Sequence, residues 1–187
     1  MKLWLLRHAQ VAVDVGTCYG STNVDCDPKA TVTAAKNFSP HPSLGSTLWT
    51  SPSSRALKLA QALASLRPDL QGPSTDSRLQ EMDFGEWEMQ PWESIPRVAI
   101  DVWADEFPHH RFGGKECVQD VLDRVADALS NTRLLGVSEM VWVTHAGVIR
   151  AVQFLSTNEK RTKIFSAADW PTSAPSMGEW ICLEIKK

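Results

Sequence analysis

The order of apolar and polar residues along the chain first predicts its strands. Residues 2–6 form an almost continuous apolar run that ends in polar residues, which is typical of a buried parallel strand. Shorter apolar runs predict further strands at 47–50 and 140–144. Alternation of side chains over 179–185 predicts a last strand at the edge of the sheet.

Helices are predicted where apolar residues recur every three or four positions. The clearest segments run over about 52–66, 116–134 and 148–155. At the start of the first one, we expect Ser51 to cap the helix and Pro52 to occupy its first position, because proline lacks only a donor that a helix start leaves unused. Strands that alternate with helices indicate an α/β fold, a three-layer sandwich whose mostly parallel central sheet carries helices on both faces.

The middle of the chain, about 67–114, is rich in Pro and Trp and has weak periodicity. It is predicted to contain a strand near 74–77 and a short helix around 92–103. We interpret it as an excursion from the sheet that borders the functional site. A length of 187 residues suffices for one full hydrophobic core and is short for two ordinary domains, so 1–187 is predicted to be a single domain.

Composition and charge exclude several classes of partner. The net charge of −3 and the sequence pI of about 5.9 give no general attraction to nucleic acid or to anionic membranes, so an anion site has to be built locally. No apolar run approaches the roughly 20 residues that span a bilayer. The amino terminus does not resemble a cleavable signal, and a cytoplasmic protein is expected.

The potential metal ligands do not form a metal-binding pattern. Four cysteines are scattered without ligand spacing, at Cys18, Cys26, Cys117 and Cys182, and free thiols in a reducing compartment are expected. The pair His109-His110 lacks a further ligand at suitable spacing. We therefore predict no metal and no other cofactor.

Charged and nucleophilic groups follow three of the predicted strands. Arg7 and His8 come after the first strand, Arg55 starts the helix after the second, and His145 follows the strand at 140–144. In open α/β sheets ligands bind outside the carboxyl ends of the strands, so these groups are expected to converge. Guanidinium groups bind phosphate oxygens as planar forks, and a neutral imidazole can attack phosphorus as a nucleophile. The sequence thus predicts a site for a small phosphorylated metabolite.

Four sequence blocks together resemble the histidine phosphatase superfamily, also called phosphoglycerate mutase-like, over nearly the whole chain. They are RHA at 7–9, SPSSRA at 51–56, LQEMDFGEWE at 79–88 and VTHAGVIR at 143–150. The third block, together with GTCYGS at 16–21 and WESIP at 92–96, is most similar to the alpha-ribazole phosphatase branch, which dephosphorylates a nucleotide precursor in cobalamin assembly.

The resemblance implies a role for each matching residue. His8 would be the nucleophile that forms a phosphohistidine, and Arg7, Arg55 and His145 would hold the phosphoryl oxygens. Glu81 would be the general acid, which is needed because an alkoxide leaving group is a strong base.

Two assignments near these residues are open. The neighbouring carboxylates Asp83, Glu86 and Glu88 are alternatives to Glu81 as the acid. Substrate binding is assigned to three residues of the loop after His8, namely Tyr19, Gly20 and Ser21. The tryptophans Trp87, Trp92 and Trp103 either stack on an aromatic base or pack in the core, and core packing is favoured.

The chain departs from the family pattern in places. Ala9 replaces the usual Gly or Thr and is small enough to be tolerated. Asp14 stands where mutase-like members often carry a phosphate-contacting Asn; either its carboxylate points away, or the loop follows the shorter-motif phosphatases, which we prefer. Lys115 and Cys117 alter a Gly-Gly-Glu-Ser stretch of the family and affect recognition of the leaving group.

The function that these observations favour is a phosphomonoesterase that works through a phosphohistidine, with alpha-ribazole 5'-phosphate as a candidate substrate. A phosphoglycerate mutase-type phosphotransferase is an alternative from a second enzyme class. A non-catalytic module that binds a phospholigand is a third reading, and the presence of all the expected catalytic groups argues against it.

Overall fold

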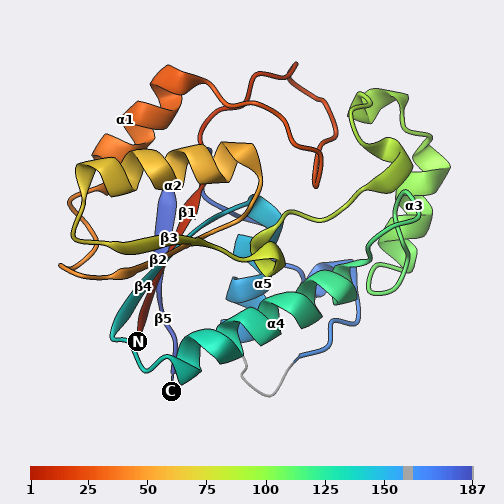
Figure 1. The fold of residues 1–187 in the computed structure, drawn as a ribbon. Coiled ribbons are helices and arrows are strands. Elements are labelled where there is room, and N and C mark those ends of the chain that lie inside the picture. The colour runs from red at the N-terminus through yellow and green to blue at the C-terminus, as the bar shows by residue number, and fades with distance from the viewer. Residues whose placement is uncertain (158–161, 187) are drawn as a thin grey trace.

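The computed structural model describes residues 1–157 and 162–186. Its centre is a five-stranded sheet in the order β3-β2-β4-β1-β5 (Figure 1). The strands are β1 (Lys2–Arg7), β2 (Thr47–Thr50), β3 (Gln71–Thr75), β4 (Glu139–Thr144) and β5 (Trp180–Glu184). The first four run parallel, whereas β5 pairs antiparallel with β1 at the edge. The mostly parallel sheet and its terminal edge strand are thus confirmed.

Helices cover both faces of this sheet and make the three-layer sandwich that the sequence predicts. The helices α1 (Pro28–Phe38) and α2 (Ser54–Leu66) lie on one face, and α4 (Val118–Leu134) and α5 (Ala146–Thr157) lie on the other (Figure 1). All six residues of β4 are buried, which explains the apolar run at its centre, 140–143. None of the described helices has both the length and the apolar character required to cross a membrane.

The predicted start of α2 is wrong. The helix begins at Ser54, with Ser53 as its N-cap residue. The backbone N–H of Ser51 instead donates to the carbonyl of Val143 at 2.9 Å, so Ser51 still pairs with β4, and its Oγ accepts the N–H of the N-cap residue Ser53 at 3.3 Å. The side chain of Ser51 is also engaged elsewhere, as described below.

Other differences from the sequence prediction have local causes. β3 lies at 71–75, before the predicted 74–77, because its sequence QGPST has no apolar signature and is mostly exposed. The predicted helix at 92–103 divides into a 3-10 turn at 92–94 and α3 (Arg97–Asp105), separated by Pro96, which cannot continue a helix from the turn. α1 was not predicted, although Asp27 caps it through the amides of Lys29 and Ala30.

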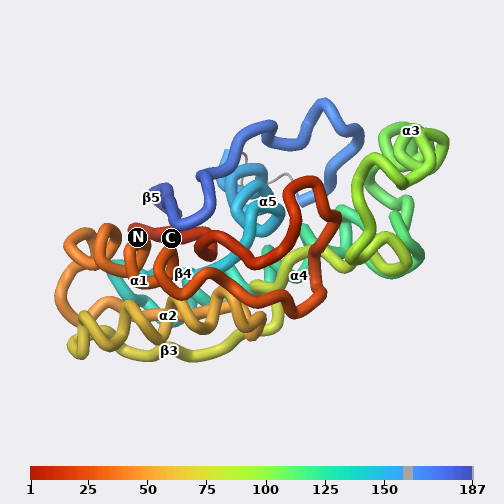
Figure 2. Tube along the Cα trace, turned by 90° about the horizontal axis from the view of Figure 1, so that it is seen from above, coloured from red at the N-terminus to blue at the C-terminus, as the bar shows by residue number. Residues whose placement is uncertain are grey.

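The segment between β3 and α4 projects from one end of the molecule, away from the two termini (Figure 2). Its base is a close crossing of two backbones at Gly85 and Gly113, both with positive φ. A Cβ on Gly113 would lie 1.8 Å from the carbonyl oxygen of Phe84, and one on Gly85 would lie 1.9 Å from that of Gly113. Only glycine allows this approach.

The crossing predicts unequal effects of two neighbouring substitutions. Gly113 and Gly114 both have positive φ, but nothing lies within 4 Å of a Cβ on Gly114. Gly114→Ala is therefore expected to lower the free energy of unfolding by about 1–2 kcal/mol, the cost of the left-handed conformation alone. Gly113→Ala should cost at least about 2 kcal/mol more, because the crossing has to separate. Urea unfolding of both variants measures this, and equal losses would contradict the packing argument.

Candidate active site

The ends of three adjacent strands bring together the residues that the sequence singled out. His8 follows β1 and donates its backbone N–H to the carbonyl of Thr144, at 2.9 Å, at the end of β4. The rings of His8 and His145 have their centroids 5.2 Å apart. Arg55 enters from the first turn of α2, and all three side chains are buried. The groups therefore form one cluster at the carboxyl edge of the sheet.

His8 is held as a neutral imidazole with a defined tautomer. Its Nδ1 lies 2.8 Å from the carbonyl oxygen of Ala9, and since a carbonyl only accepts, Nδ1 carries the proton. Burial and the charges of Arg55 and Arg7 lower the pKa of His8 to about 3, although the bond to Ala9 acts in the opposite direction. At neutral pH the Nε2 lone pair is therefore available for nucleophilic attack.

His145 is fixed by the serine that the sequence assigned to a helix cap. Its Nε2 lies 2.9 Å from Ser51 Oγ, which in turn hydrogen-bonds to Ser53. Burial, followed by the charges of Arg55 and His8, lowers the pKa of His145 well below its usual value. Its Nδ1 is buried and has no hydrogen-bond partner among the described residues.

Each of the two arginines has a buried Nε donor that is unused. Arg55 donates through Nη1 and Nη2 to the carbonyls of Thr22 and Gly20, at 2.8 and 2.5 Å. Arg7 donates through Nη1 to the carbonyl of Pro175 at 3.0 Å. The Nε atoms of both are buried without a partner in the described chain. Together with His145, each residue expected to hold phosphoryl oxygens thus has a buried nitrogen without a partner, and such atoms are rare in native proteins.

Glu88 organises the loop after β1. Its carboxylate accepts the backbone N–H groups of Gly20, Ser21 and Thr22, at 2.9, 3.0 and 3.2 Å, and that of Phe84 at 3.0 Å. Burial alone would raise the pKa of Glu88, but these hydrogen bonds lower it overall. Because Glu88 accepts four backbone amides, whereas Glu81 accepts two, Glu88 is a positioning residue for the loop and a poorer candidate than Glu81 for an acid.

The residues assigned to substrate binding lie in this loop. The guanidinium carbon of Arg55 is 5.3 Å from the centroid of the Tyr19 ring, and the Tyr19 hydroxyl lies 3.9 Å from Met177 Sδ. Gly20 has no room for a side chain, since a Cβ would lie 1.9 Å from the Met82 carbonyl oxygen. Ser21 lines a polar pocket that also contains Glu81.

Glu81 lies at the amino terminus of α5. Its Oε2 accepts the N–H of Gly147 at 3.0 Å, and its Oε1 accepts that of Met82 at 3.2 Å. A Cβ on Gly147 would lie 2.2 Å from Glu81 Oε1, so the glycine next to Ala146 makes room for the carboxylate. The charge of Glu81 also raises the pKa of Arg55 against the larger lowering by burial, which places the carboxylate within electrostatic reach of the cluster.

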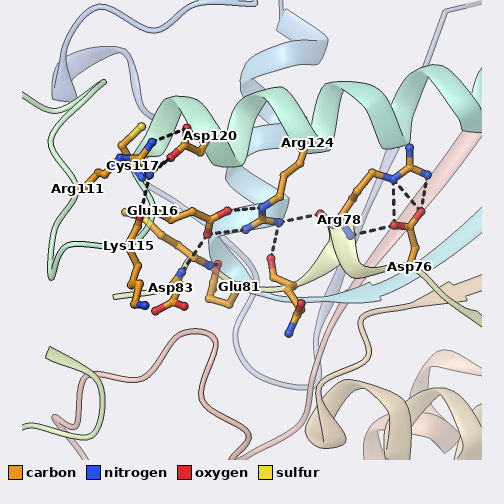
Figure 3. Close-up of polar contacts among 12 residues, drawn as sticks. Asp76, Arg78, Glu81, Asp83, Arg111, Lys115, Glu116, Cys117, Asp120 and Arg124 are labelled. Carbon is orange, nitrogen blue, oxygen red and sulfur yellow. Dashed lines mark hydrogen bonds and ion pairs between the residues drawn. The ribbon is translucent and has the colours of Figure 1, made fainter. Parts of the chain in front are cut away.

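A polar clamp from α4 fixes the backbone on both sides of Glu81 (Figure 3). Arg124 donates to the carbonyls of Arg78 and Gln80, at 2.7 Å each, and to Glu116. Glu116 accepts the N–H of Asp83 at 3.0 Å. Sequence reasoning missed Arg124 because nothing distinguishes it from other charged residues of α4. The Asp83 carboxylate accepts the N–H of Gly85 at 2.8 Å, and Glu86 is exposed.

The departures from the family pattern lie at different depths. Asp14 is exposed, next to a fully exposed Val15, in the loop after β1. Lys115 is exposed and lines the polar pocket. Cys117 is the buried N-cap residue of α4, and its backbone N–H donates to Asp120 at 3.0 Å. Within the described ranges, no three His, Cys, Asp or Glu side chains gather as a metal site.

Comparison with known proteins assigns the chain to a family. A model of the histidine phosphatase superfamily (branch 1) matches residues 3–167. The chain belongs to this superfamily. Its curated relatives include a protein from Hydrogenobacter thermophilus named "Putative phosphoserine phosphatase 2", which is 28% identical over 165 residues, 83% of this chain and 78% of that protein.

Several solved structures have the same fold as this member of the histidine phosphatase superfamily. A mycobacterial glucosyl-3-phosphoglycerate phosphatase, solved with VO3, has a TM-score of 0.78 and 22% identity, over 98% of this chain and 92% of that one. A phosphoglycerate mutase from Thermus thermophilus has a TM-score of 0.68 and 22% identity, over 98% and 93%. The phosphoglycerate mutase-like fold is thus confirmed.

The position of Glu88 predicts a pH-dependent stability difference. Glu88→Gln is expected to lower the free energy of unfolding by about 1–2 kcal/mol near neutral pH, allowing for its partial exposure. Because the pKa of Glu88 is lowered in the folded protein, this stabilisation is present above the unfolded pKa and is lost as pH falls through the folded pKa. Urea unfolding across this acidic range measures the difference, which should shrink with falling pH.

The exposed neighbour supplies the control. Glu86→Gln changes the same charge on the same segment without touching the loop after β1, and no loss of stability is expected. A difference between Glu88→Gln and the wild type that is independent of pH would contradict the assignment of Glu88 as an ionised anchor.

Proposed function

We propose that this histidine phosphatase hydrolyses the phosphate monoester of a small metabolite through a phosphohistidine on His8. The observation that carries the proposal is the neutral state of His8 within a cationic cluster. Its Nδ1 proton is held by Ala9, so Nε2 has a free lone pair. The unpartnered Nε atoms of Arg7 and Arg55 supply donors for the oxygens of a phosphoryl group, and Nδ1 of His145 adds a third when Ser51 Oγ donates to its Nε2.

In the first step, Nε2 of His8 attacks phosphorus, and the N–P bond forms as the bond to the leaving oxygen breaks. Arg7, Arg55 and His145 hold the three equatorial oxygens and stabilise their charge. Glu81 transfers its proton to the departing alkoxide, which leaves as an alcohol.

In the second step, the ionised Glu81 accepts a proton from water, and the oxygen of that water attacks phosphorus. The N–P bond breaks, inorganic phosphate leaves, and His8 returns to its neutral form with Glu81 protonated again. The same carboxylate thus serves as acid and then as base. Its anchors at Gly147 and Met82 keep it in one place for both steps.

The finer proposal for the substrate is alpha-ribazole 5'-phosphate. It rests on the likeness of 16–21, 79–88 and 92–96 to that branch of the family. The relatives found by comparison carry other names, a phosphoserine phosphatase and a glucosyl-3-phosphoglycerate phosphatase. All these substrates are phosphate monoesters of small molecules, which is the common ground of the proposal.

The nucleophile is tested by trapping the intermediate. His8→Ala is expected to lower the rate of phosphate release by at least about 10³-fold, since the group proposed to attack phosphorus is removed. Wild-type protein quenched during turnover of a ³²P-labelled substrate should carry an acid-labile, base-stable phosphoryl group that His8→Ala lacks. His109→Ala, at an exposed histidine, is the matched control. Turnover that survives in His8→Ala would overturn the mechanism.

The acid is tested by varying the leaving group. Glu81→Gln is expected to lower kcat by about 10²–10⁴-fold for an alkyl phosphate, whose leaving group needs a proton. The loss should be much smaller for the first turnover of p-nitrophenyl phosphate, whose leaving group is stable as an anion. Glu86→Gln should leave both rates unchanged. An equal loss for both substrates in Glu81→Gln would assign Glu81 a role other than proton donation.

A further inference from the structure

An apolar cavity of about 210 Å³ is bordered by Glu81, which also borders the polar pocket. Four aromatic side chains form much of its wall: Phe84, Trp103, Phe107 and Trp170. Gly147, which donates to Glu81, borders the same cavity. The carboxylate proposed to donate the proton is therefore part of the cavity lining.

Two polar atoms in this wall lack partners. Trp103 Nε1 is buried without a hydrogen bond in the described chain, and so is Nε of Arg150 from α5. The guanidinium of Arg150 otherwise reaches only the carbonyl of Thr172, at 3.5 Å, and forms no ion pair with a described residue. Buried donors of this kind point to a ligand that carries an acceptor.

The tryptophans of the projecting segment differ in whether they line the cavity. Trp92 stacks on Phe112, with ring centroids 6.0 Å apart, and does not line the cavity. Trp103 also stacks on Phe112, at 4.4 Å, yet one side of it faces the cavity. Core packing thus accounts for Trp92 and only in part for Trp103.

The polar pocket that Glu81 also borders is a weaker candidate for the leaving group. It is larger, about 510 Å³, and contains Ser21, Lys115 and Arg124. Arg124 is already engaged by Glu116 and two carbonyls. Water satisfies the exposed polar groups there, whereas apolar walls and unpartnered donors gain from an organic ligand.

We propose that the cavity is the leaving-group subsite and that the preferred substrates are phosphate monoesters of alcohols with an aromatic ring that bears an acidic or acceptor group. The inference rests on the proposed phosphatase function. An apolar cavity of about 150 Å³ is known to hold benzene, so this one accommodates a substituted ring. The ring lies against the aromatic wall, its acceptor binds Arg150, and its alcohol oxygen lies at Glu81.

The predicted preference for an aromatic ring is tested with two substrates that release the same kind of leaving group. 2-Phenylethyl phosphate and ethyl phosphate both release a primary alkoxide, so a difference in kcat/KM reports on the cavity. A preference of about 10-fold or more for the aromatic substrate is expected. Trp170→Ala should remove most of this preference. Trp92→Ala, at a tryptophan outside the cavity, is the matched control and should retain the preference.

The predicted binding of an acidic group on the ring is tested at Arg150. Adding a para-carboxylate to the ring of 2-phenylethyl phosphate should raise kcat/KM in the wild type by about 10-fold. Arg150→Gln should abolish that gain while leaving the ratio between 2-phenylethyl and ethyl phosphate intact. If the carboxylate gives no gain, or if the gain survives in Arg150→Gln, the assignment of Arg150 is overturned.

A binding measurement separates this inference from the proposed function. Calorimetry with 2-phenylethylphosphonate and ethylphosphonate, which cannot be hydrolysed, reports occupancy of the cavity without turnover. Tighter binding of the aromatic phosphonate, lost in Trp170→Ala, supports the subsite even if no ester is hydrolysed. Hydrolysis that depends on His8 but is equal for aromatic and ethyl esters, with equal phosphonate affinities, retains the phosphatase and overturns the subsite.

Discussion

The parallel pairing of β4 with β1 on one side and β2 on the other is the constraint on which the site depends. Arg7 pairs with Thr144 and Thr50 with Val143, so the three strands end at the same level. The pairing continues one residue further through the backbone of His8 and that of Ser51. The polypeptide then leaves each of these strands at the same edge of the sheet, and the side chains that follow the strands gather there. Residues far apart in the sequence meet there without a long loop to order them.

The charges gathered at this edge serve two purposes at once. Burial lowers the pKa of His8 most, and the guanidinium groups that would bind phosphate lower it further. In the proposed mechanism, the cations that attract the substrate thus also help to keep the nucleophile neutral. Each buried donor without a partner costs about 1–3 kcal/mol in the folded protein. Phosphate oxygens would recover that cost, so part of the binding affinity is stored in the fold.

How much of this could be predicted depends on burial. β1 and β4 were found because strands buried on both faces have to be apolar throughout. β3 was misplaced because an exposed edge strand carries no such signature. α1 escaped notice although Asp27 and Pro28 are start signals, since the helix has few apolar residues beyond one narrow face.

The residues of the site likewise divide into those that the sequence predicted and those that it missed. His8, Arg55 and His145 were singled out because strand ends and helix starts have recognisable sequences. The role of Ser51 was wrong, since an N-cap and a hydrogen bond to His145 look the same from a serine before a helix. Glu88 and Arg124 act through backbone groups more than 40 residues away, and no local pattern encodes such contacts. Their identification required the folded chain.

Glu81 lies between the cluster of arginines and histidines and the aromatic cavity. The phosphate cluster, the amino terminus of α5 and the clamp from α4 belong to the sandwich, whose packing leaves little freedom. The aromatic wall beside Glu81 comes mainly from the projecting segment, through Phe84 and Trp103, and from Trp170 before β5. Substitutions in those segments would reshape the proposed leaving-group subsite without displacing a strand end. The proposed chemistry thus depends on the sheet, and the proposed substrate preference depends on the segments that border it.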